Sequence, residues 1–254
     1  MARYQLTLAY DGANFFGSQR QAKKRTVQGE LEKALRGLGW TDRSALLSGR
    51  TDTGVHATGQ VAACDLEWRH TDEDLIRALN ATLPKDMAIW GAKVVRGDFH
   101  PRFDAVSRTY RYRLFCGALR DPMRERFAWR LNSALDDDLL REASQMFLGE
   151  HDFFAFGSPT SPNGTTARAV TKATWTRIEE DQWQFDVEAD SFLYRMVRRM
   201  VFVQAAVGQR KISAETIAES LKPTARRERS ALPAGLAPAC GLTLIAVQYQ
   251  ESIY

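Results

Sequence analysis

Hydrophobic and polar residues alternate along some stretches of the chain and follow a helical spacing in others. Residues 3–10 carry large apolar side chains at every second position, which predicts a half-buried strand. These side chains are Tyr4, Leu6, Leu8 and Tyr10. Residues 26–38 instead place apolar side chains three and four apart behind Thr26, which predicts a helix with Thr26 as its N-cap.

The pattern continues through the first half of the chain with alternating segments and one more helical segment. We expect strands near 44–48, 59–66 and 87–96, and a helix over 72–80 that ends before Pro84. The order strand, helix, strand, strand, helix, strand is that of a ferredoxin-like fold.

The second half repeats this order of elements without a visible sequence repeat. A long loop rich in Gly, Pro, Ser and Thr interrupts it at 148–167. The predicted strands are 108–115, 168–178, 182–189 and 242–249, and the predicted helices are 135–147, 192–207 and 213–221. The last-but-one helix should carry an apolar stripe of Phe192, Met196, Met200 and Val203, with Arg195, Arg198 and Arg199 along an adjacent face.

The composition is that of an ordinary soluble globular protein. Of 254 residues, 44% are hydrophobic and 26% charged, and no apolar run is long enough to span a bilayer. The first residues form no signal-peptide core, so we expect a cytoplasmic protein with no membrane association. The cysteines Cys64, Cys116 and Cys240 and the four scattered histidines show no metal-ligand spacing, and no phosphate-binding glycine loop occurs. We therefore expect no metal and no small-molecule cofactor, with Cys64 and Cys116 buried in strands.

The net charge of +4 is unevenly distributed. The basic runs 20–25 and 195–211 contain no acidic residue, whereas 179–190 holds six. Such runs are often simple solvated faces. Several runs separated from acidic regions favour a one-sided positive surface, as a nucleic-acid partner requires.

The segment 47–57 has the composition of a chemically active loop. Gly49 and Gly54 bracket Arg50, Thr51 and Asp52, and the segment ends close after His56. Glycines permit a sharply shaped loop that can hold a carboxylate and a guanidinium in place. The alternative is a surface turn in which Asp52 caps the backbone.

The strand predicted at 108–115 interleaves aromatic and basic residues. Tyr110, Tyr112 and Leu114 share one face, while Arg111 and Arg113 point to the other. Aromatic rings beside arginines suit base stacking and phosphate contact. Core tyrosines with exposed arginines are the other explanation.

The segment Gly49–Ala57 resembles the active-site motif Gly-Arg-Thr-Asp-x-Gly-Val-His-Ala of the tRNA pseudouridine synthase A family at all eight fixed positions. The segment Phe99–Ala105 and the Tyr-x-Tyr of the following strand are also similar to family segments. The resemblance covers nearly the whole chain and is strongest over 1–113. The chain departs from the family at Ser18, Arg199 and Phe202, where the family tends to have Trp, Asn and Gly.

This resemblance implies an α+β fold of two ferredoxin-like (RRM-like) halves, 1–104 with the catalytic loop and 105–254. Their mixed, mainly antiparallel sheets would join around a central active-site cleft. It also implies a homodimer that isomerises uridine to pseudouridine in the anticodon arm of tRNA, at positions 38, 39 or 40.

The resemblance implies Asp52, Tyr110 and Arg198 as catalytic residues. Asp52 would act as nucleophile or as general base, Arg198 would pair with it, and Tyr110 would stack on the uracil. Arg50 would enter the space that the flipped uridine leaves. The other candidates for substrate binding are Thr51, His56, Arg102, Arg20 and Arg195.

Two further functions remain open at this point. Asp52-Thr53-Gly54 is also the Asp-Thr-Gly of aspartic proteases, but the chain has no second copy and predicts many helices, whereas those proteases are all-β. A non-catalytic RNA-binding protein would explain the charge and the Tyr-x-Tyr, but not the complete motif around Asp52.

Overall fold

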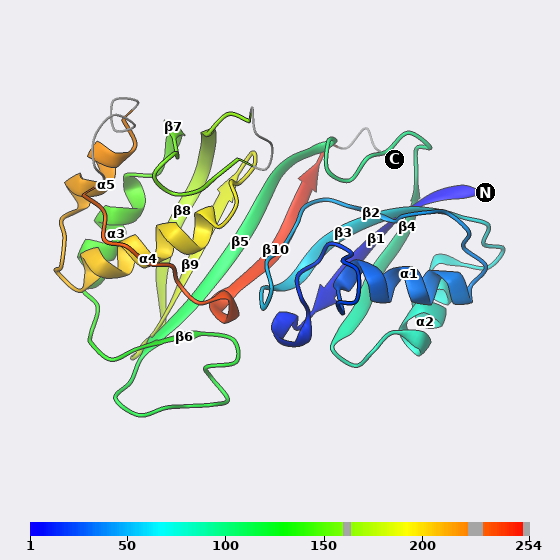
Figure 1. Cartoon of the computed structure of the whole chain (residues 1–254), viewed down its shortest axis with the longest axis horizontal. Helices are drawn as coiled ribbons and strands as arrows, with labels where there is room; N and C mark the ends of the chain where they lie inside the picture. Colours follow the sequence, from blue (N-terminus) through cyan, green and yellow to red (C-terminus); the bar gives the residue numbers. More distant parts are fainter. Residues whose placement is uncertain (160–163, 223–230, 251–254) are drawn as a thin grey trace. The chain divides into compact units, whose positions relative to one another are not determined.

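The computed structural model describes residues 1–159, 164–222 and 231–250, and these form two compact units (Figure 1). The first unit comprises Met1–Arg108 and the end of the chain from Thr243; the second comprises Thr109–Leu242. The predicted ranges 1–104 and 105–254 differ from this division, because they assign the last strand to the second half. Whether those ranges fold as domains stays a prediction.

The first unit has a sheet with β1 at its centre. The strands are β1 (Ala2–Tyr10), β2 (Leu46–Leu47), β3 (His56–Leu66), β4 (Met87–Val95) and β10 (Leu242–Tyr249). β1 pairs antiparallel with β3 and β4, β2 pairs antiparallel with β3, and β10 pairs with β3 in parallel. The predicted face of β1 is buried, but Gln5 and Ala9 of the opposite face are buried too. β1 is therefore more buried than its alternation predicts.

Two helices pack beside each other in this unit, α1 (Val27–Gly37) and α2 (Asp72–Thr82) (Figure 1). Thr26 caps α1 as predicted, because its side chain accepts the Gly29 N–H. Thr71 and Asp74 form a capping box at the start of α2. Both caps fix where the helices begin and so fix the lengths of the loops before them.

The second unit is also mixed α and β. In its sheet, β5 is followed in order by β9, β8 and β7, and β6 pairs with β5 in parallel. The strands are β5 (Ala105–Cys116), β6 (Trp129–Leu131), β7 (Gly149–Asp152), β8 (Ala167–Glu179) and β9 (Gln182–Ala189). β7–β8 and β8–β9 are antiparallel. The sequence pattern missed β6 and β7, which are too short to show an alternation; β7 lies inside the segment 148–167 that was expected to be a loop.

The helices of the second unit are α3 (Asp137–Gln145), α4 (Met196–Gly208) and α5 (Ala214–Ser220). The prediction that α4 begins at Phe192 is wrong. Arg195 has a left-handed backbone with φ 65°, which cannot continue a right-handed helix, so α4 begins at Met196. Met196, Met200 and Val203 are buried as predicted, but Phe192 and Arg195 precede the helix.

The cysteines behave differently from one another. Cys64 is buried as predicted, and burial raises the pKa of its thiol to about 12. Cys116 is partly exposed, so the expectation of a buried residue there was wrong. Among the described residues, no cluster of His, Cys, Asp and Glu could hold a metal ion, and no helix is long and apolar enough to cross a membrane.

Candidate active site

The loop between β2 and β3 carries three of the predicted site residues, and a fourth, His56, directly follows it. Arg50 is exposed on it, Asp52 is partly exposed, and Thr51 between them is buried. His56 is the first residue of β3 and is only 3% exposed. The loop thus leaves Arg50 exposed and Asp52 partly exposed, while the residue between them is buried.

Ser18 holds the backbone of Thr51 on both sides. The Thr51 N–H donates to the Ser18 hydroxyl at 2.8 Å, and the Ser18 N–H donates to the Thr51 carbonyl at 3.1 Å. Ser18 is 0% exposed. The Thr51 side chain is held as well, because its hydroxyl lies 2.9 Å from the Tyr10 hydroxyl. The residue before Asp52 is therefore fixed through its backbone and its side chain.

Tyr10 and Gln60 extend this buried network under the start of the loop. The Gln60 amide nitrogen donates to the Gly49 carbonyl at 3.2 Å and to the Tyr10 hydroxyl at 3.5 Å, and its oxygen accepts from the Ser48 hydroxyl at 2.6 Å. Burial raises the pKa of Tyr10 to about 12, although its hydrogen bonds act in the other direction. Its phenol stays neutral at physiological pH and serves as a hydrogen-bonding support.

Two glycines allow the end of the loop to pack closely. Gly54 has φ 79°, which favours glycine, and a Cβ on Gly12 would lie 2.0 Å from the Val55 carbonyl oxygen. The Gly12 N–H donates to His56 Nδ1 at 3.0 Å, and Asp11 Oδ1 lies 3.1 Å from the same nitrogen. His56 is therefore tied through this nitrogen to the turn that follows β1.

Arg108 connects this loop to the turn that carries Arg102. Its guanidinium donates to the carbonyls of Arg102 at 2.6 Å and Ser48 at 3.4 Å. Arg102 itself is exposed, with its guanidinium 5.8 Å from the centre of the exposed Phe103 ring. The sequence pattern placed Arg108 only at the start of the strand predicted over 108–115. Its structural role depends on two carbonyls, one of them far away in the sequence, so no local signal indicated it.

Arg20 is engaged with a buried carboxylate. Its guanidinium donates to Glu32 at 2.6 Å and to the Arg43 carbonyl at 3.1 Å. The side chain of Glu32 is 1% exposed, whereas that of Arg20 is 43% exposed. Arg20 therefore anchors the segment after Ser18 to α1, with part of its guanidinium open to solvent.

The remaining predicted residues belong to the second unit. Tyr110 of β5 is partly buried and meets the Phe192 ring edge-on, with centroids 5.1 Å apart. In the first turn of α4, Arg198 donates through Nε to the Ala237 carbonyl at 2.8 Å. Arg195 is exposed before the helix, with its guanidinium 4.7 Å from the centre of the Tyr194 ring.

Two of the departures from the family pattern pack the segment 233–237 against α4. The Arg199 guanidinium donates to the carbonyls of Pro233 at 2.5 Å and Gly235 at 2.9 Å. Gly235 has φ 144°, and a Cβ there would come within 2.2 Å of the Phe202 ring. That ring stacks on Trp129, with centroids 6.1 Å apart. Arg199 and Phe202 thus have structural roles in this chain.

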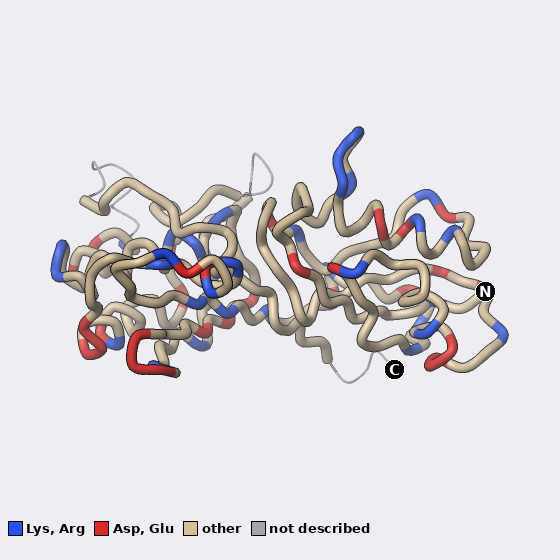
Figure 2. The backbone as a smooth tube through the Cα atoms, turned by 90° about the horizontal axis from the view of Figure 1, so that it is seen from below, with Lys and Arg blue, Asp and Glu red and all other residues tan. Residues whose placement is uncertain are grey.

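Several arginines of the basic stretches are paired with acids, and Lys and Arg are interspersed with Asp and Glu along both units (Figure 2). Arg111 of β5 makes a two-point contact with Asp186 at 2.8 and 3.0 Å. Arg25 does the same with Asp86 at 2.8 and 2.7 Å. These pairs reduce the positive charge that the linear runs suggest, and a one-sided positive surface stays a prediction.

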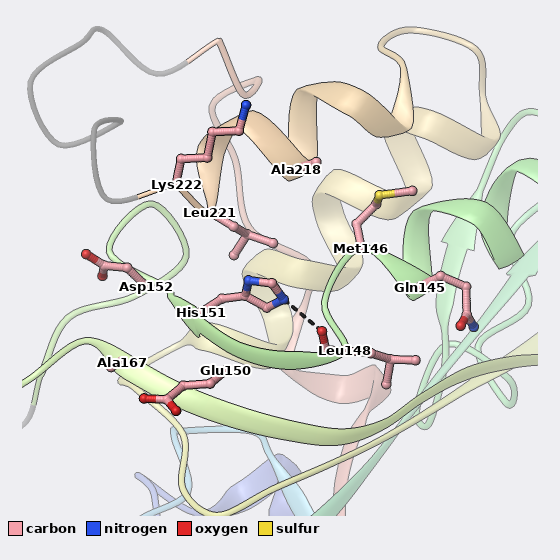
Figure 3. A pocket seen from close by; sticks show the side chains of 10 residues that line it. All are labelled: Gln145, Met146, Leu148, Glu150, His151, Asp152, Ala167, Ala218, Leu221 and Lys222. Carbon is pink, nitrogen blue, oxygen red and sulfur yellow. Dashed lines mark hydrogen bonds between the residues drawn. The ribbon is translucent and has the colours of Figure 1, made fainter.

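A cavity of about 740 Å³ lies elsewhere, within the second unit (Figure 3). The end of α3, β7 and α5 contribute to its walls, and His151 Nε2 lies 2.7 Å from the Leu148 carbonyl oxygen at its side. No predicted site residue lines it. It is distinct from the loop that carries Asp52.

The sequence matches the family model described as tRNA pseudouridine synthase over residues 7–104 and 143–250. A solved Cbf5–Nop10–Gar1 complex aligns with a TM-score of 0.43 and 12% identity, over 96% of this chain and 48% of that chain. This similarity is too weak to support a conclusion.

Full-length relatives are similar as well. A tRNA pseudouridine synthase A of Limosilactobacillus fermentum is 39% identical over 99% of this chain and 97% of the relative. The protein of that name from Chloroflexus aurantiacus is 40% identical over 100% of this chain and 91% of the relative. That from Methylacidiphilum infernorum is 40% identical over 98% of this chain and 97% of the relative. The chain belongs to the tRNA pseudouridine synthase A family.

Proposed function

We propose that the protein converts uridine to pseudouridine in the anticodon arm of tRNA, at position 38, 39 or 40, without a cofactor. The observation that carries the proposal is the loop around Asp52. It matches the family motif at all eight fixed positions, and it holds a partly exposed carboxylate on a backbone anchored by buried hydrogen bonds. Family membership removes the aspartic protease alternative.

The reaction rearranges bonds without adding or losing atoms. The bond between C1′ of the ribose and N1 of uracil breaks, the base turns, and a bond forms between C1′ and C5. The proton on C5 leaves and N1 gains one. In these steps Asp52 acts as the nucleophile or as the base that removes a proton. Because nothing is added or lost, the reaction needs no energy source.

Residues of both units act on the same uridine in this proposal. Arg198 pairs with Asp52 and orients its carboxylate, and Tyr110 stacks on the uracil. A uridine within a stem must leave its stack, at a cost of a few kcal/mol. The exposed Arg50 is long enough to occupy the space it leaves.

The other predicted residues divide into two groups. Thr51 and His56 are buried, so we assign them to support of the loop rather than to contact with RNA. Arg102, Arg20 and Arg195 are exposed wholly or in part, and we assign them to contacts with the tRNA backbone.

We further propose two ferredoxin-like halves around a central cleft, and a homodimer in the cytoplasm. The pairings of β4, β1, β3 and β2 support the first half, because they give the antiparallel order of that fold. The assembly is tested by light scattering on the purified protein in the presence and absence of tRNA. A monomer under both conditions would contradict the dimer.

The activity is tested by incubating unmodified tRNA transcripts with the protein and analysing the nucleosides by mass spectrometry. Asp52→Asn keeps the size of the side chain but loses its basicity and nucleophilicity. We expect it to bind tRNA and to form pseudouridine at less than a few per cent of the wild-type rate. Asp98→Asn, an exposed carboxylate of the same unit, serves as the control and should remain active. Wild-type binding without any pseudouridine would favour the RNA-binding alternative.

A further inference from the structure

We infer that Ser18 is a positioning residue for the reaction: its hydroxyl fixes the backbone N–H of Thr51, the residue before Asp52, without contacting the substrate. This inference rests on the proposed function. It concerns a position where the chain departs from its family, and it follows from the hydrogen bonds around the catalytic loop.

All three polar groups of Ser18 have protein partners. Its N–H donates to the Thr51 carbonyl at 3.1 Å, and its carbonyl accepts from the Gln28 N–H at 2.9 Å. Its hydroxyl accepts from the Thr51 N–H at 2.8 Å. Gln28 lies in the first turn of α1, so Ser18 connects the start of that helix to the residue before Asp52.

Of these three bonds, only the one to the hydroxyl depends on the side chain. Replacing Ser18 by alanine keeps both backbone bonds and leaves the Thr51 N–H without its acceptor. Thr51 is 7% exposed and Ser18 0%, so little water can reach that N–H. A buried donor without an acceptor costs more than the bond itself contributes, and the peptide will turn toward another acceptor.

The peptide that would turn joins Arg50 to Thr51. Its rotation changes the backbone of Thr51, and the next peptide, between Thr51 and Asp52, passes this change on to the Asp52 carboxylate. Misplacement of a reacting group by about 1 Å can reduce a rate about 100-fold. A tryptophan in place of Ser18 could not provide this acceptor, because an indole has only a donor.

The alternative is that the hydroxyl contributes to stability alone, as any buried hydroxyl does. Ser144 provides a matched control, because it is also 0% exposed and its hydroxyl also bonds a backbone group, the Arg141 carbonyl, at 2.8 Å. It lies on α3 in the second unit, whereas the loop that carries Asp52 belongs to the first.

The experiment compares Ser18→Ala with Ser144→Ala in three measurements: the single-turnover rate constant at saturating enzyme, the Kd for tRNA, and the Tm. We expect both variants to lose some thermal stability and to bind tRNA within twofold of wild type. Only Ser18→Ala should slow the single turnover, by about 10- to 100-fold. Ser18→Cys, which keeps the side-chain volume and a weak acceptor, should fall between Ser18→Ala and wild type.

A rate constant of folded Ser18→Ala within twofold of wild type would overturn the inference, as would a loss confined to tRNA affinity. If Ser18→Ala does not fold, Ser18→Cys is measured instead. A slowed single turnover of this variant supports the inference, and an unchanged one overturns it. The result is separate from the test of the proposed function. A wild-type protein that forms no pseudouridine refutes that function, whereas an active wild type with an equally fast Ser18 variant refutes only the positioning role.

Discussion

Arg198 and Arg199 are neighbours on α4 with the same charge, and the structure gives them different partners. Arg198 donates through Nε to the Ala237 carbonyl, and in the proposed function it also pairs with the Asp52 carboxylate. Arg199 donates through Nη1 to the carbonyls of Pro233 and Gly235. Replacing each by lysine keeps the charge and removes the planar group. We expect the first change to affect catalysis and the second to affect stability.

The magnitudes follow from the bonds that each change removes. In the proposed function Arg198 holds Asp52 at two points, and losing that contact would cost about 1.5–3 kcal/mol, the range for hydrogen bonds to charged groups. In the transition state this slows the reaction about 10- to 150-fold. Arg199→Lys weakens two bonds to carbonyls, that of Pro233 partly buried and that of Gly235 exposed, for about 1–3 kcal/mol of folding free energy. In a chain of this size that lowers the Tm by about 2–12 °C.

Single-turnover kinetics at 25 °C and thermal unfolding of both variants provide the assay. We expect Arg198→Lys to be slow with nearly unchanged tRNA affinity, and Arg199→Lys to turn over at close to the wild-type rate while melting earlier. Equal single-turnover rates for the two variants would remove Arg198 from the catalytic residues. A Tm of Arg199→Lys equal to that of wild type would refute the structural role given to Arg199.

Three further predictions follow from charges in the structure. Binding of tRNA should weaken steeply between low and physiological salt, because each neutralised phosphate releases counterions; an affinity that salt does not change would contradict the basic surface. Arg20→Ala should lower the Tm, because it removes a partner of the buried Glu32, whereas Lys24→Ala in the same exposed run should not; equal Tm values would contradict the anchoring role. The Arg3 hydrogen bond holds the pKa of Asp65 below its usual value despite some burial, so this pair stabilises the fold above about pH 4 and progressively less as the pH falls below it. Denaturant titrations should therefore show Asp65→Asn less stable than wild type at pH 7, with a difference that shrinks in acid, and a constant difference would refute this assignment.

The sequence by itself determined most of the elements and the position of the chemistry. The strands β1 and β4 and the helices α1 and α2 follow from periodicity and caps, which are local properties of the chain. The motif around Asp52 is contiguous, so it could be read from the residues alone. The same holds for the family to which the chain belongs.

Only the tertiary structure decided what supports that chemistry. Ser18 and Thr51 are 33 positions apart and meet only because the loop after β1 lies against the loop before β3. The basic run 20–25 does not show that Arg20 pairs with the buried Glu32, because that carboxylate comes from α1. A hydrogen bond needs both partners within about 3 Å, and which distant donors and acceptors come together depends on the packing of the whole unit.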